Sequence, residues 1–75
     1  MKARILALIA QTLEIDLDSI KPDRQLVEYG LDSARAMDLV VALEEAFNLS
    51  IPDDVARGLR SVDDIVRYVS SQETP

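Results

Sequence analysis

The chain has 75 residues, of which 48% are hydrophobic and 29% charged, and its formal net charge is −6. A chain of this size and composition indicates one small globular domain over residues 1–75. The negative charge argues against nucleic acid and anionic membranes as partners, because both require a positive protein surface. The absence of cysteine and histidine excludes disulfides, thiolate chemistry and histidine-based acid–base catalysis, so we expect no enzyme.

Residues 2–14 are predicted to form the first helix. The basic, apolar start is similar to a signal peptide, but it runs into Gln11 and Thr12 without a small-residue cleavage site. No apolar run reaches the roughly 20 residues of a membrane span. We therefore expect a cytoplasmic protein in which this helix belongs to the core. Its apolar stripe consists of Ile5, Leu6, Ile9 and Leu13.

Residues 15–31 are predicted to form a long loop. Asp16 and Asp18 lack the further ligands and the glycine of a calcium loop, so we expect no metal site there. A loop of this length in a small domain needs apolar anchors. The expected anchors are Ile20, Leu26, Val27 and Tyr29.

The second helix is predicted over residues 33–47. Its core face consists of Leu39, Val40, Leu43 and Phe47, which recur at three- and four-residue spacing. A second apolar stripe of Ala34, Met37 and Val41 is accompanied by Asp38, Glu44 and Glu45. We interpret this stripe as surface. The alternative is that Met37 and Val41 turn inward and line a cavity.

The start of this helix offers two residues that favour N-cap positions, Asp32 and Ser33. The positive end of the helix dipole favours an anion at Ser33. A nucleophilic serine needs a base within hydrogen-bonding reach, and only Asp32 and Arg35 are ionisable neighbours in the sequence. We therefore interpret Ser33 as a residue that is modified, with a plain N-cap serine as the alternative.

Two further helices follow. The stretch from Ser50 to Asp53 supplies a cap, an early proline and an acidic first turn, which predicts a short third helix over residues 53–58. A capping box that begins at Ser61 predicts a last helix over about 62–71, and the chain is expected to fray into a tail over residues 70–75. The fold class is therefore all-α: a small four-helix bundle with three longer helices and one short third helix, and with a long loop between the first two.

The stretch from Gly30 through Ser33 to the Leu-Glu-Glu-Ala-Phe ending at Phe47, followed by Ile51-Pro52-Asp53, resembles the acyl carrier proteins of fatty-acid and polyketide synthesis. The resemblance covers nearly the whole chain. It implies that a phosphopantetheinyl transferase attaches a 4′-phosphopantetheine arm from coenzyme A to Ser33, and that Asp32 helps to position the transferase's metal ion. The thiol of the arm would then carry acyl groups as thioesters.

Two residues depart from the family pattern. Ala34 stands where Leu is usual, and Arg35 stands where an acidic or neutral residue is common. We expect Arg35 to pair with the phosphate of the arm. We also expect a monomer that presents one surface to acyl-loading enzymes, ketosynthases or other pathway enzymes with basic patches. That surface comprises Ala34, Arg35, Met37, Asp38, Val41, Glu44, Glu45, Asp53 and Asp54.

Other functions remain open from the sequence. One is an unmodified acidic helical module that binds a basic partner. Another is a peptidyl carrier domain of a peptide synthetase, although the paired glycines usual in that serine motif are absent from Tyr29-Gly30-Leu31. The start at Met1 favours a free-standing protein, with a domain excised from a larger synthase as the alternative.

Overall fold

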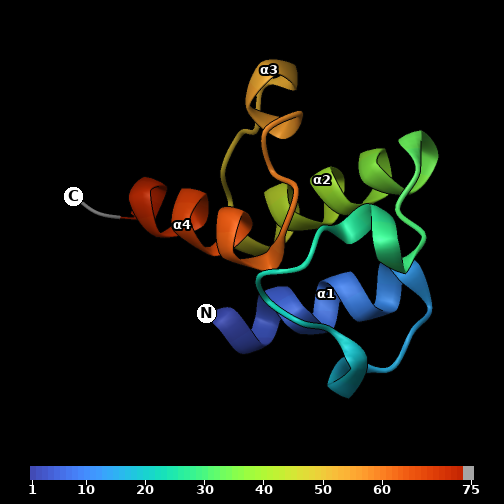
Figure 1. Cartoon of the computed structure of the whole chain (residues 1–75). Helices are drawn as coiled ribbons and strands as arrows, with labels where there is room; N and C mark the ends of the chain where they lie inside the picture. The colour runs from blue at the N-terminus through green and yellow to red at the C-terminus, as the bar shows by residue number, and fades with distance from the viewer. Residues whose placement is uncertain (74–75) are drawn as a thin grey trace.

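The computed structural model describes residues 1–73, and this part of the chain contains four α-helices, two short 3-10 helices and no strand. No helix in it is long and apolar enough to cross a membrane. The α-helices are α1 (Lys2–Leu13), α2 (Ser33–Phe47), α3 (Asp53–Ala56) and α4 (Val62–Glu73), and the 3-10 helices are η1 (Leu17–Ser19) and η2 (Leu26–Tyr29). The predicted all-α architecture with one short third helix is confirmed (Figure 1).

The first helix, α1, packs against both α2 and α4. Its start meets the end of α2, where the Arg4 guanidinium donates a 3.0 Å hydrogen bond to the Ala46 carbonyl and lies 4.8 Å from the centre of the Phe47 ring. Its start also meets the end of α4, because Ser70 Oγ lies 3.2 Å from Met1 Sδ. The helix α1 therefore runs antiparallel to both, while α3 stands apart from this group (Figure 1).

The core lies between these helices and the long loop. Three predicted core residues, Leu6, Val40 and Phe47, are only half-buried and pack around its edge. No buried polar side-chain atom in the described part of the chain lacks a hydrogen-bond partner. The buried apolar residues are Ile5, Ile9, Leu13, Ile20, Leu26, Leu39, Leu43, Ile51, Val62, Ile65 and Val69.

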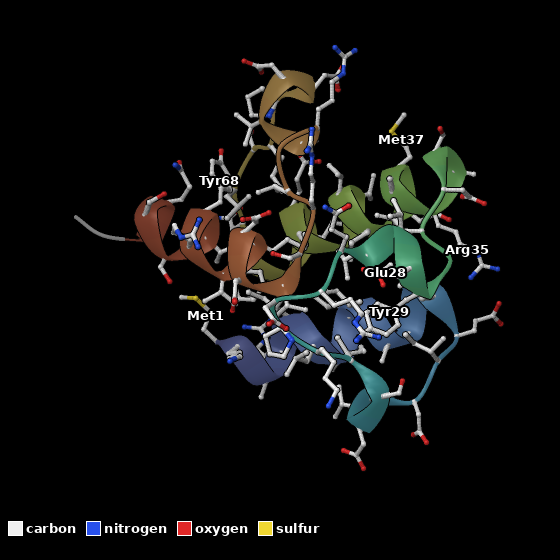
Figure 2. The ribbon with its side chains drawn as sticks, viewed as in Figure 1. Met1, Glu28, Tyr29, Arg35, Met37 and Tyr68 are labelled. Atoms are coloured by element: carbon white, nitrogen blue, oxygen red, sulfur yellow. The ribbon has the colours of Figure 1, made fainter. Side chains whose placement is uncertain are left out.

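Three of the predicted loop anchors, Ile20, Leu26 and Tyr29, are confirmed, since Ile20 and Leu26 belong to the buried core and Tyr29 packs against it. Leu26 is completely buried, and its N–H donates a 2.7 Å hydrogen bond to the Arg60 carbonyl just before α4. The hydroxyl of Tyr29 accepts a 2.7 Å hydrogen bond from the Lys21 N–H, and the ring lies over this part of the loop (Figure 2). The prediction for Val27 was wrong, because the single turn of η2 buries Leu26 and leaves the next side chain 62% exposed.

Two helices end on non-glycine residues in the left-handed conformation. Glu14 has φ 56°, and the N–H of the following Ile15 donates to the Ala10 carbonyl, so α1 ends one residue before the predicted boundary. Asn48 ends α2 in the same conformation, with φ 52°. Asparagine tolerates this conformation well, whereas glutamate is strained there.

The helix α3 is shorter than predicted. After Ala56 the backbone tightens, and the Gly58 N–H donates to the Val55 carbonyl three residues earlier. The predicted cap from Ser50 does not form. Pro52 occupies the N-cap position, and the Ser50 carbonyl instead accepts a hydrogen bond from a tyrosine hydroxyl of α4.

The last helix, α4, begins with the predicted Ser61 cap, but the return bond from Asp64 goes to the residue before the cap. Ser61 Oγ accepts a 3.2 Å hydrogen bond from the Asp64 N–H, and Asp64 Oδ2 accepts one from the Arg60 N–H. The helix continues through Glu73 instead of ending at 71, so the frayed tail was wrongly predicted for residues 70–73. Ser71 Oγ supports these turns by donating to the Tyr68 carbonyl. The remainder of that tail, Thr74 and Pro75, lies outside the described residues.

Candidate functional site

The site is built at the start of α2, where Asp32 is the N-cap. Asp32 Oδ1 accepts a 2.9 Å hydrogen bond from the Arg35 N–H, and its carbonyl accepts one from the Ala36 N–H. Gly30 makes the preceding turn with φ 98°, a conformation that glycine adopts without strain. Ser33 is therefore the first residue of the helix, and capping is performed by its neighbour.

The hydroxyl of Ser33 is available for modification. Its side chain is exposed, and it forms no side-chain hydrogen bond within the part of the chain that the structure describes. The N-terminal end of α2 adds a favourable dipole for an anion attached to this oxygen. The interpretation of Ser33 as a plain N-cap is therefore wrong.

Two surface hollows meet at Ser33. The η2 hollow, about 430 Å³, lies on the side of the long loop, and its walls include Gln25, Val27, Leu31, Leu59, Arg57 and Arg60. The α2–α3 hollow, about 400 Å³, lies on the other side, and its walls include Met37, Val40 and Asp53. Ser33, Ala36, Ala56 and Arg57 border both hollows.

The exposed side of α2 carries most of the predicted partner surface. Met37 is 65% exposed and Val41 is 46% exposed, so the alternative that both turn inward is wrong. Figure 2 shows Met37 projecting from α2 away from the rest of the molecule. We call this surface the α2 outer face, and it comprises Ala34, Met37, Asp38, Val41 and Glu45, all of which are exposed.

Arg35 does not join this face. Its guanidinium lies toward the end of α1, 3.3 Å from the Thr12 carbonyl and 3.6 Å from a carboxylate oxygen of Glu14 (Figure 2). The free carbonyls at the end of a helix attract cations, so this position is favourable. Arg35 is two residues beyond Ser33 and lies on another side of α2, which overturns its expected pairing with a phosphate at the serine.

Glu44 also has a different position from the one expected. Its Oε2 accepts a 2.8 Å hydrogen bond from the Ile51 N–H, and the side chain is half-buried. It therefore fixes the connection between α2 and α3. Asp53 and Asp54 are exposed in the first turn of α3, and Asp53 borders the α2–α3 hollow.

Sequence reasoning missed Arg57 and Arg60. Both are exposed, and both border the η2 hollow beside Ser33. The only sequence signal was the appearance of two arginines shortly after the acidic pair Asp53-Asp54. No cluster of three or more metal-ligating side chains occurs in the described part of the chain.

The fold and the site define a small helical protein that exposes one serine at a helix start. The family described as "phosphopantetheine attachment site" matches residues 3–69. An acyl carrier protein of Syntrophobacter fumaroxidans is 39% identical over 74 residues, covering 97% of this chain and 91% of the relative. A free-standing peptidyl carrier protein from an Acinetobacter baumannii secondary metabolic pathway has a TM-score of 0.86 and 25% identity, covering 97% of this chain and 91% of that chain.

The chain therefore belongs to the phosphopantetheine-attachment family of carrier proteins, whose cofactor is a covalent 4′-phosphopantetheine arm. The residues present fit such a group. An exposed hydroxyl stands at a helix start, and hollows on both of its sides leave room for a chain attached to the oxygen. The walls combine apolar side chains with the positive charges of Arg57 and Arg60.

Proposed function

We propose that this protein is an acyl carrier protein in which Ser33 is the attachment point of the arm. The observation that carries the proposal is the exposed Ser33 hydroxyl, which two hollows border. This hydroxyl does not cap α2, because Asp32 performs that role. When bound, the arm supplies the thiol that holds an acyl group as a thioester. The chain itself has no cysteine, so it contributes no thiol of its own.

In the attachment reaction, the Ser33 oxygen forms an ester bond with the phosphorus that bears the pantetheine of coenzyme A. The pyrophosphate bond breaks, adenosine bisphosphate leaves, and the transferase takes up the serine proton. The chain's own part is to hold the hydroxyl exposed at the positive end of α2. We assign Asp32 Oδ2 to the transferase's metal ion, because Oδ1 is the oxygen that accepts the capping hydrogen bond.

The remaining function of the chain is presentation of cargo to other proteins, without catalysis. The α2 outer face combines a small apolar patch with the carboxylates of Asp38 and Glu45, and Asp53 and Asp54 extend the negative surface onto α3. Such a surface attracts the transferase and pathway enzymes through basic patches, and its small area keeps each encounter short. We propose that a cytoplasmic monomer performs this role.

The attachment is tested by incubating the purified chain with a phosphopantetheinyl transferase and coenzyme A, followed by intact-mass measurement. We expect one phosphopantetheine addition to the wild type and none to Ser33→Ala. Ser50→Ala is the matched control, because Ser50 is also exposed and uses its carbonyl, not its hydroxyl, in the bond with Tyr68. An unmodified wild type would refute the proposal and favour an unmodified interaction module. A modified Ser33→Ala would refute Ser33 as the attachment point.

A second candidate concerns the cargo. The structural similarity to a free-standing peptidyl carrier protein favours aminoacyl groups as an alternative to simple acyl groups. Both cargoes are thioesters on the same arm, so the loaded form distinguishes them. Loading by an amino-acid-activating enzyme, and not by an acyl-loading enzyme, would identify the peptidyl type.

A further inference from the structure

The arginines of this acidic chain differ in whether their guanidinium groups have partners. Four are engaged within the described residues: they bond to carbonyls, face an aromatic ring or pair with carboxylates. Arg57 and Arg60 have no such side-chain partner in that part of the chain. The engaged arginines are Arg4, Arg24, Arg35 and Arg67.

Arg57 and Arg60 lie close together in the sequence and border the same hollow. Arg57 directly follows α3, Arg60 precedes α4, and both residues border the η2 hollow together with Ser33. The backbone of this short segment is fixed at Arg60 by two hydrogen bonds. Arg60 accepts the Leu26 N–H at 2.7 Å through its carbonyl, and its own N–H donates to Asp64.

Two positive charges would offset the negative charges that surround Ser33. Asp32 borders the η2 hollow and Asp53 borders the α2–α3 hollow, so two carboxylates already flank Ser33. A phosphodiester on the serine adds a third negative charge. Arginine matches phosphate geometry with its planar, multiply donating guanidinium.

We propose that Arg57 and Arg60 bind the phosphodiester of the arm on Ser33 and direct the arm into the η2 hollow. This inference rests on the proposed function, because it requires the arm at Ser33. The walls of the hollow suit such a chain: Val27, Leu31 and Leu59 offer apolar contact, and Gln25 offers an amide for hydrogen bonding. This contact also accounts for Val27, whose side chain remains 62% exposed beside the hollow.

The test compares the apo and loaded forms by nuclear magnetic resonance, after intact-mass measurement has shown that the arm is attached. We expect the Nε–Hε signals of Arg57 and Arg60 to shift on loading, while that of Arg67 does not. We also expect the phosphorus signal of the loaded wild type to be broader than that of loaded Arg57→Gln/Arg60→Gln, because the bound phosphodiester reorients with the protein. High salt should reverse both effects, since these side chains are exposed.

The matched control is Lys2→Gln/Arg67→Gln, which also removes two positive charges and touches neither hollow. It should retain the broad phosphorus signal of the wild type. Unchanged Arg57 and Arg60 signals in the loaded wild type would overturn the inference, even if the variant could not be loaded. Equal phosphorus line widths in the wild type and Arg57→Gln/Arg60→Gln would overturn it as well. Failure of the proposed function is distinct, since it appears as a missing mass addition.

Discussion

The carboxylate of Glu44, in the last turns of α2, accepts a 2.8 Å hydrogen bond from the backbone N–H of Ile51. Ile51 is buried, and its N–H lies just before the start of α3. One acidic side chain therefore fixes the connection between the helix that bears the site and the short helix beside it. Its neighbour Glu45 is exposed and belongs to the α2 outer face.

This relationship predicts that the same substitution will change the free energy of unfolding at Glu44 but not at its neighbour Glu45. Glu44→Lys should lower the free energy of unfolding by about 1.5–3 kcal/mol, because the charge-assisted hydrogen bond to Ile51 is lost. Glu44→Gln retains an acceptor and should lose less. The free energy of unfolding of Glu45→Lys should remain within about 0.5 kcal/mol of the wild-type value. Urea unfolding of the three variants and the wild type measures these differences. Equal stability of Glu44→Lys and Glu45→Lys would show that the hydrogen bond contributes nothing.

A second prediction concerns the charge of the α2 outer face. Glu45→Lys and Asp38→Lys should slow the transferase reaction at low salt, because attraction to a basic patch accelerates encounter. The difference from the wild type should shrink as salt is added. The matched control is Asp63→Lys, which makes the same charge change at an exposed position of α4. If Asp63→Lys slows the reaction as much, total charge and not the location of the face is responsible.

A third prediction concerns the apolar part of the α2 outer face, where a substitution should weaken the docking of partner enzymes without changing the stability of the fold. Met37→Ala should leave the free energy of unfolding within about 0.5 kcal/mol, because 65% of Met37 is exposed. Leu43→Ala, on the buried side of α2, should cost about 2–5 kcal/mol. Met37→Ala should nevertheless weaken the docking of partner enzymes, measured as a raised KM. An unchanged KM would remove Met37 from the partner surface.

Two substitutions separate the functions of Asp32. Asparagine caps a helix as well as aspartate does, so Asp32→Asn should preserve stability while removing the negative charge. Asp32→Ala should also lose about 1 kcal/mol of stability, because the Arg35 N–H loses its acceptor. Both variants should be modified slowly by the transferase if the second carboxylate oxygen helps to hold its metal ion. Rapid modification of Asp32→Asn would restrict Asp32 to capping.

The strained end of α1 offers a stabilising change. Glu14 has φ 56°, and within residues 1–73 its side chain forms only an exposed pair with Arg35. Glu14→Gly should therefore raise the free energy of unfolding by about 0.5–1 kcal/mol, since glycine adopts this conformation without strain. Thermal unfolding measures the gain. Glu14→Ala is the control, which removes the same ion pair without relieving the strain, and an equal gain from it would contradict the explanation.

The sequence by itself determined the three longer helices and the position of Ser33 at the start of the second of them. Periodic apolar residues placed α1, α2 and α4, and the Asp32-Ser33 pair located the start of α2, because these are local properties of spacing and capping. The same spacing correctly placed Met37 and Val41 on the surface in the preferred interpretation.

Only the tertiary structure decided what each charged side chain contacts. Arg35 reaches the end of α1, and Glu44 reaches the N–H of Ile51. Neither contact follows from the spacing of residues along one helix, because packing brings different segments of the chain together. Arg57 and Arg60 come to border the same hollow as Ser33 in the same way, because the short segment between α3 and α4 and the start of α2 both contribute walls to it. Long polar side chains choose among several partners in space, and a one-dimensional pattern contains no information on which of them lies nearest.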